Sequence, residues 1–153
     1  MYKNAGDETK SFIYGAAGTG KTHLAISIAK ILKEEGFLVG VLTTGTLLSK
    51  IKSTYQKGAS KTEEDVFKDI SKFDLLILDD LGSEARSNDE FDWSKNKLFE
   101  IVNHRIGKPT IYTSNFNELH LPTAIGERVF SRLQYNNKFI ELIADDFRTN
   151  FRS

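Results

Sequence analysis

The amino-acid sequence predicts an α/β domain in which helices flank a parallel sheet of five strands. Short apolar runs alternate with segments whose apolar residues recur at helical spacing, which is typical of parallel sheets built from strand–helix–strand units. A glycine-rich stretch separates the first apolar run from the first helical segment, and two aspartates directly follow the third run. The 153 residues contain no repeat, low-complexity tract or linker, so residues 1–153 are expected to form a single domain.

The expected strands are the apolar runs at residues 11–15, 37–42, 75–78, 110–113 and 139–142. The expected helices span residues 21–35, 46–58, 62–71, 94–106 and 123–133. Gly36 is placed to cap the first helix, and Thr62, followed by three acidic residues, is placed to begin the third. Residues 1–10 are polar and are expected to be a loose lead-in. Residues 83–93 predict a polar loop, with Trp93 as an anchor packed at the next helix.

The composition excludes several classes of protein. Lys plus Arg and Asp plus Glu number 21 each, which argues against a chain coated with nucleic acid, so any such contact must be local. No apolar run approaches the roughly 18 residues of a membrane span, and residues 1–8 hold no apolar signal-peptide core. Cysteine is absent, which excludes disulfides and thiolate metal sites and is compatible with a reducing cytoplasm.

Residues 15–22 read Gly-Ala-Ala-Gly-Thr-Gly-Lys-Thr and fit the phosphate-binding loop G-x-x-x-x-G-K-[ST]. Backbone N–H groups must wrap a polyphosphate there, and glycines at positions 15, 18 and 20 keep side chains out of the way. The helix that follows directs its unpaired N–H groups and its dipole at the negative charge. Lys21 can reach the β- and γ-phosphates, and the Thr22 hydroxyl can ligate Mg²⁺. The alternative, a chance match in a glycine-rich turn, is disfavoured by the flanking strand and helix.

The third apolar run ends in Asp79 and Asp80. The carboxyl ends of parallel strands share one edge of the sheet, so these acids are expected beside the phosphates. Asp79 would hold Mg²⁺, directly or through water, and Asp80 would orient or activate the attacking water. The alternative is an acidic turn after a buried strand.

Two further polar features follow later strands. Ser114 and Asn115 come after the strand at 110–113, where Asn115 could hydrogen-bond the γ-phosphate or the water, or simply form an Asx-turn. Arg128 and Arg132 are four residues apart and share one helical face. They are either surface ion-pair partners or a source of an arginine finger, a cation offered to the γ-phosphate in a neighbouring subunit.

The window from Thr43 to Lys61 contains no acidic residue. In a chain of zero net charge, its lysines form a local basic surface, to which Tyr55 adds an aromatic ring. One interpretation is a solvated helix face. The other is contact with single-stranded DNA, in which lysines bind phosphates and Tyr55 stacks on a base. The candidate DNA-binding residues are Lys50, Lys52, Tyr55 and Lys57.

Five segments together resemble the AAA+ ATPase domain of bacterial replicative-helicase loaders of the DnaC/DnaI type, a clan that includes the IstB-like transposition ATPases. They are Gly15 to Ala25, Leu75 to Gly82, Thr113 to Asn115, Gly126 to Leu133 and Phe147-Arg148. The similarity spans nearly the whole chain. The resemblance implies a P-loop NTPase fold of the AAA+ class, without the helical lid domain of typical AAA+ proteins.

The resemblance also implies roles for single residues. Asp79 and Asp80 match the Walker B acids, Asn115 matches sensor 1, Arg132 matches the trans-acting finger and Arg148 matches sensor 2. The helix at 46–58 matches the loader-specific insertion that faces single-stranded DNA. The nucleotide-binding set becomes Gly15, Gly18, Thr19, Gly20, Lys21, Thr22 and His23, although for His23 packing is the safer interpretation.

The sequence departs from the family pattern in two respects. Most AAA+ enzymes carry Glu where Asp80 stands, so slow turnover is expected; loaders share this aspartate. Loaders also carry an N-terminal helicase-binding region, and that region is expected to be absent here because about ten residues precede the first strand.

The expected function is therefore that of a cytoplasmic helicase-loader domain in the initiation of DNA replication. It would bind and weakly hydrolyse ATP with Mg²⁺, associate head-to-tail with copies of itself, contact single-stranded DNA and serve a replicative helicase bound by a region outside this chain. The nearest alternative is an IstB-like ATPase that assists a DNA transposase. Alternatives of another class are a small-molecule phosphotransferase and a DNA-binding scaffold with a vestigial ATP site.

Overall fold

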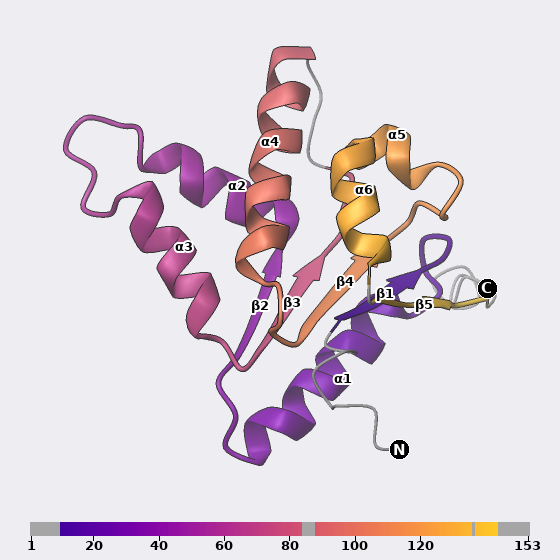
Figure 1. The fold of residues 1–153 in the computed structure, drawn as a ribbon. Helices are drawn as coiled ribbons and strands as arrows, with labels where there is room; N and C mark the ends of the chain where they lie inside the picture. Colours follow the sequence, from indigo (N-terminus) through magenta and orange to yellow (C-terminus); the bar gives the residue numbers. More distant parts are fainter. Residues whose placement is uncertain (1–9, 84–87, 136, 144–153) are drawn as a thin grey trace, which may run out of the picture.

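The computed structural model describes residues 10–83, 88–135 and 137–143. Its centre is one sheet of five parallel strands, in the order β2-β3-β4-β1-β5 (Figure 1). The strands are β1 (Lys10–Tyr14), β2 (Val39–Thr43), β3 (Leu75–Asp79), β4 (Thr110–Ser114) and β5 (Asn137–Glu141). All five expected strands are thus present, each within two residues of its expected position.

Helices cover both faces of the sheet (Figure 1). One face carries α1 (Lys21–Glu34). The other carries α2 (Thr44–Ser53), α3 (Glu63–Lys72), α4 (Asn88–His104), α5 (Leu121–Ile125) and α6 (Glu127–Gln134). No helix follows β5 in the described part of the chain. None of the helices within the described ranges is both long and apolar enough to cross a bilayer.

The two faces of the sheet are packed differently because alternate strand residues point to opposite sides. On the α1 face, Ala25 and Ala29 bring the helix close to Ile13, Ile77 and Ile111. The other face holds the larger core, with big apolar side chains from every covering helix. Its central sheet residues are Phe12, Leu76, Leu78 and Tyr112.

The helix expected at 46–58 is shorter and earlier, since α2 spans Thr44–Ser53. Two side-chain hydroxyls explain where α2 ends, because they compete with backbone N–H groups for its last carbonyls. The Ser53 hydroxyl donates to the Lys50 carbonyl at 2.7 Å, and the Thr54 hydroxyl donates to the Ile51 carbonyl at 2.6 Å. Tyr55 and Lys57 therefore lie in the connection beyond the helix.

The expected loop at 83–93 is wrong in its second half, because α4 begins at Asn88. Residues 83–92 contain one large apolar side chain, Phe91, so no hydrophobic period could reveal the first helical turns. Trp93, expected at the end of the loop as an anchor for the next helix, lies within α4 itself, and its ring packs against the larger core.

The single helix expected at 123–133 is also wrong, because Gly126 divides it into α5 and α6. Gly126 has φ 95° and ψ 147°, a conformation that residues with a Cβ rarely adopt. Beyond this break, α6 packs against α4. The helix start expected at Thr62 is confirmed by a full capping box, in which Thr62 and Asp65 bond each other's backbone N–H groups.

Arg105, at the end of α4, is fully buried and ties three segments together. Its guanidinium donates to the carbonyls of Ile70, Phe73 and Pro109 at 2.8, 2.9 and 2.6 Å, and to the Thr110 hydroxyl at 2.9 Å. Burial lowers the pKa of Arg105 from its ordinary value. This side chain fixes the end of α3 to the turn that leads into β4.

Candidate nucleotide site

The glycine-rich stretch connects β1 to α1 at the carboxyl edge of the sheet (Figure 1). A Cβ on Gly15 would collide with the carbonyl oxygen of Leu142, so the loop can follow this path only with glycine there. Gly20 is the N-cap residue of α1, with φ 91° in the left-handed region. The loop thus presents the N-terminus of α1 to the space where a polyphosphate would bind.

Two side chains of the loop fold over its own backbone. The Lys21 ammonium donates to the Ala16 carbonyl at 2.9 Å, and the Thr19 hydroxyl donates to the same oxygen at 2.9 Å. Both side chains are buried, each with 7% of its surface exposed. His23, the third residue of α1, is exposed, and its carbonyl accepts a bond from the Ser27 hydroxyl. Lys21 and Thr19 therefore belong to the loop, whereas His23 makes no side-chain contact in it among the described hydrogen bonds.

Thr22 and Asp79, expected to share a magnesium site, are in direct contact. The Thr22 hydroxyl donates to the Asp79 carboxylate, at 3.0 Å from Oδ1 and 3.3 Å from Oδ2. A hydroxyl and a carboxylate side by side at the mouth of a phosphate loop are oxygen ligands of the kind that Mg²⁺ takes, with water and phosphate filling its other positions. The pair therefore fits this ion. Within the described ranges, no group of three or more His, Cys, Asp or Glu side chains is placed to hold a metal.

Thr113, on β4, bonds both aspartates, a role that was not predicted from the sequence. Its hydroxyl donates to Asp79 Oδ1 at 2.5 Å and accepts a bond from the Asp80 backbone N–H at 3.0 Å. Its side chain is 1% exposed. The available signal was a hydroxyl in a strand whose five residues are all buried, because a buried polar side chain needs a partner.

Asp80 has φ 66°, the one positive φ of a non-glycine residue in the described segments. Asp is among the few residues that tolerate this left-handed region, and such strained positions cluster at functional sites. The turn carries the chain out of β3, and the Leu81 N–H donates to the Thr113 carbonyl at 2.7 Å. Asp80 is therefore held at the edge of the sheet by its backbone.

Asn115 follows the end of β4 and is exposed. Its neighbour Ser114 is buried, and the Ser114 carbonyl accepts a bond from the Gly15 N–H at 3.3 Å. This bond joins the end of β4 to the start of the glycine loop. The structure thus brings Asn115 to the same edge as the loop and the two aspartates.

Arg128 and Arg132 share one face of α6, as expected from their spacing. Their guanidinium carbons lie 4.1 and 5.6 Å from the centre of the Phe99 ring on α4. Both side chains are exposed, so they are supported by an aromatic ring and still reach solvent. Arg148, the expected sensor 2 residue, lies outside the described residues.

The candidate DNA-binding residues do not form one surface. Lys52 lies over the Trp93 ring, 4.9 Å from its centre, and Tyr55 meets the same ring edge-on at 6.3 Å. Lys50 instead lines a hollow beside β2, and Lys57 is exposed in the connection after α2.

Tyr55 is held by an acid that the sequence places outside the lysine window. Its hydroxyl donates to Glu63 at 2.8 Å, and the Lys97 ammonium reaches the same carboxylate at 2.5 Å. Burial raises the pKa of Glu63, but the bonds from Lys97 and Tyr55 outweigh it and leave the pKa below its ordinary value. Burial likewise lowers the pKa of Lys97, and its bonds to Glu63 and Glu100 leave it raised.

The Lys52–Trp93 contact adjoins the aspartate pair. A hollow of about 470 Å³ is lined by both of these residues and by Asp80. Its other lining residues are Thr43, Gly45, Thr46, Leu48, Ser49, Ser83 and Ser94. A basic and aromatic surface thus opens onto the second acid of the nucleotide site.

The chain is similar to known ATP-binding proteins over most of its length. Residues 7–150 match the model of the family described as IstB-like ATP binding protein. It is 34% identical over 130 residues to the replicative helicase loader DnaC of Buchnera aphidicola (subsp. Acyrthosiphon pisum) and, again at 34%, to that of Escherichia coli K12. These alignments cover 83% of this chain and 51% of each relative, so the chain spans about half the length of the curated relatives it matches.

Solved structures agree with the sequence comparison. The crystal structure of the DnaC helicase loader superposes with a TM-score of 0.74 at 27% identity, covering 92% of this chain and 82% of that one. The replication initiator DnaA, bound to AMPPCP and single-stranded DNA, superposes with a TM-score of 0.76 at 26% identity, covering 90% of this chain and 41% of that one. By sequence and by fold, the chain belongs to the family of IstB-like ATP binding proteins and is a P-loop ATPase domain of the AAA+ class.

Proposed function

We propose that this chain is the ATPase domain of a replicative-helicase loader, which binds ATP with Mg²⁺ and hydrolyses it slowly. The observation that carries the proposal is the contact of Thr22 with Asp79 beside the glycine loop. The similarity to DnaC loaders supports the choice of process. Such a domain would act in the cytoplasm, where the bacterial chromosome lies.

The residues of the site divide the chemistry among them. Lys21 exchanges the Ala16 carbonyl for the β- and γ-phosphates, and the N-terminus of α1 stabilises their charge. Thr22 and Asp79 hold Mg²⁺, which neutralises charge on the phosphates when bound. Asp80 orients the attacking water, with Asn115 beside it at the edge of the sheet. Lys21→Ala should abolish ATP binding measured by calorimetry, and retained affinity would refute the assignment of the loop.

Arg132 supplies the remaining cation to the site of a neighbouring copy. Arg132 lies on α6, exposed over the Phe99 ring of α4. Such a position suits a residue that contacts a neighbouring subunit in a head-to-tail array. Such an array forms an open spiral when its rotation does not close. Arg132→Ala should keep nucleotide binding and lose hydrolysis, whereas Arg128→Ala, on the same ring, is the matched control. Unchanged turnover in the Arg132 variant would refute the shared site.

Single-stranded DNA binds the surface formed by Lys52, Tyr55 and Trp93, with Lys57 as an outlying phosphate contact. An aromatic pair beside a lysine is suited to base stacking and phosphate binding. Because this surface shares a hollow with Asp80, bound DNA can change the position of the second acid. Turnover should therefore change when oligo(dT) is added, and Tyr55→Ala should abolish that change while basal turnover is measured in parallel. Equal turnover of the unaltered chain with and without DNA would refute the coupling.

The partner in this proposal is a replicative helicase, recognised by a part of the protein outside this chain. The family match favours one further candidate, an ATPase that assists a DNA transposase. A pull-down of the full-length parent with helicase or with transposase, each with and without ATP, separates the two. Transfer of phosphate to a nucleotide acceptor would instead identify a phosphotransferase.

A further inference from the structure

A second large hollow lies away from the nucleotide site, beside the outermost strand. It has a volume of about 720 Å³ and is bounded by β2, α2, α3 and the connection between these helices. Apolar side chains form much of its lining, among them Leu38, Val41, Ala59 and Val66. Leu38 and Val41 are 52% and 46% exposed, so they form an apolar surface that the described part of the chain leaves open to solvent. We call this hollow the β2 groove.

The floor of the β2 groove is shaped by Gly40 and Phe73. A Cβ on Gly40 would come within 2.8–2.9 Å of the Phe73 ring, so glycine lets the ring lie flat against the strand. Both residues line the groove. Because the Phe73 ring packs so closely on Gly40, it leaves the neighbouring part of β2 accessible from the groove.

One side of β2 offers unpaired backbone groups. β2 pairs with β3 on one side, and no strand among the described residues pairs with the other. The Leu38 carbonyl accepts from the Asp74 N–H on the β3 side, at 2.8 Å. Because alternate residues of a strand direct their backbone groups to opposite sides, Val39 and Val41 direct theirs to the open side. An open edge of this kind is a template for another extended chain.

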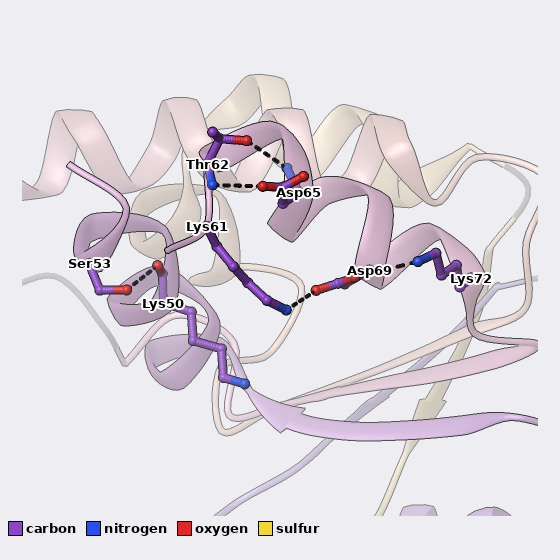
Figure 2. A network of polar contacts seen from close by, with 7 residues as sticks. All are labelled: Lys50, Ser53, Lys61, Thr62, Asp65, Asp69 and Lys72. Atoms are coloured by element: carbon purple, nitrogen blue, oxygen red, sulfur yellow. Dashed lines mark hydrogen bonds and ion pairs between the residues drawn. The ribbon is translucent and has the colours of Figure 1, made fainter. Parts of the chain in front are cut away.

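Lysines surround the apolar lining, and Figure 2 shows how they are arranged. Lys61 and Lys72 both approach one carboxylate, that of Asp69, at 2.7 and 3.7 Å. Lys50 extends from α2 toward β2, and among the described residues its ammonium makes no ion pair. Three lysines and one aspartate line the groove, and that aspartate already serves two of the lysines. The groove therefore carries a surplus of positive charge.

We propose that the β2 groove binds an extended acidic segment of a partner protein, which pairs with the open edge of β2 as an added strand. The backbone of Val39 and Val41 supplies the pairing, and the apolar lining takes alternate side chains of the segment. Carboxylates of the segment lie against Lys50, Lys61 and Lys72. This site is independent of the nucleotide site and of the surface around Trp93.

A peptide fits the groove better than a nucleic acid or a second copy. Base stacking needs accessible aromatic rings, and the one ring in the groove lining, that of Phe73, lies flat against Gly40. A second copy would bring the same lysines against these lysines in a two-fold contact, since such interfaces use one patch twice. An acidic strand meets neither obstacle.

The test uses a fluorescein-labelled octapeptide in which valine alternates with glutamate, measured by fluorescence anisotropy with the whole chain. We expect saturable binding that weakens with added salt and is about tenfold weaker for Lys50→Glu. Lys30→Glu, which changes net charge equally on the exposed side of α1, should bind like the unaltered chain. Deuterium exchange should show slowed amide exchange at Val39 and Val41 when the peptide is bound. Circular dichroism checks that both variants are folded.

Other outcomes overturn the proposal. Equal binding of a valine–lysine octapeptide, or of the acidic peptide with alternate backbone nitrogens methylated, would exclude recognition by charge or by strand pairing. Displacement of the peptide by oligo(dT) would assign the groove to nucleic acid. A dimer in sedimentation that Lys50→Glu disrupts and that excludes the peptide would assign it to a second copy. Absence of saturable binding, or equal affinities of the two lysine variants, would refute the site itself.

Discussion

Replacing Thr113 by valine should perturb the proposed magnesium site, because one hydroxyl bonds both aspartates. The Thr113 hydroxyl donates to Asp79 and accepts from the Asp80 N–H. Valine has nearly the same shape, so the variant removes these two bonds and little else. Thr113 is a positioning residue in this scheme, acting on bound Mg²⁺ only through Asp79.

The magnitude follows from the two bonds. A hydrogen bond to a charged group contributes about 1.5–3 kcal/mol, and the orphaned Asp80 N–H costs about 1–3 kcal/mol. The added methyl of valine offsets about 1 kcal/mol by its burial. The free energy of unfolding should thus fall by about 1.5–5 kcal/mol. The affinity for ATP should fall about tenfold in Mg²⁺ and remain unchanged in EDTA, because only the metal-dependent part of binding uses Asp79.

Urea unfolding and titration of a fluorescent ATP analogue, each with Mg²⁺ or with EDTA, measure these effects. Thr113→Ser keeps the hydroxyl and should retain the magnesium dependence of the unaltered chain, at a cost of about 1 kcal/mol for the lost methyl. If Thr113→Val and Thr113→Ser bind ATP with the same magnesium dependence, the hydroxyl does not position Asp79 and the reasoning is refuted.

Three further predictions concern other parts of the chain. Arg105→Met should lower the free energy of unfolding, measured in urea, by more than about 4 kcal/mol, because the substitution leaves several buried carbonyl acceptors without a donor. A loss below about 1 kcal/mol would contradict the role of this side chain. The pKa of Glu63 is lower in the folded chain than in the unfolded one. The contribution of Glu63 to folding stability is therefore fully present above the unfolded pKa of about 4.3 and is lost as pH falls through the folded pKa. The stability difference between the unaltered chain and Glu63→Gln should therefore shrink below about pH 4, and a pH-independent difference in urea midpoints would argue against this linkage. Gly15→Ala should lower nucleotide affinity more than tenfold because the new Cβ meets the Leu142 carbonyl. The control is Gly36→Ala, at a positive φ in open space, which should cost about 1 kcal/mol of stability and leave nucleotide affinity unchanged. Equal affinities of the two variants would contradict this account.

The strands and the nucleotide loop could be predicted because their signals are local. The apolar run before Asp79 and the glycine spacing at residues 15–20 each depend on neighbouring residues alone. The parallel topology then brings Thr22 and Asp79 to one edge, and they meet although they are 57 residues apart. Where residues follow the ends of strands in a parallel sheet, sequence reasoning can predict that they lie at the same edge.

The failures concern features that the hydrophobic period along the chain does not reveal, some local and some between separate segments. Ser53 and Thr54 end α2 by bonding carbonyls that could have continued the helix. Gly126 takes a positive φ that separates α5 from α6, and no period in the sequence distinguishes this glycine from one inside a helix. The window around Lys50 is acid-free along the chain, yet folding brings Asp69 and Glu63 to its side chains.

The left-handed backbone at Asp80 has a consequence for how this ATPase could change its speed. In the proposed mechanism, glutamate would extend the second acid by one methylene toward the attacking water, but glutamate enters this region of φ less readily than aspartate does. The longer residue would favour a relaxed peptide, which would carry the Asp80 N–H away from Thr113 and redirect the chain as it leaves β3. In the proposed mechanism, the reach of the second acid and the direction of the chain beyond β3 therefore both depend on the backbone at this one residue.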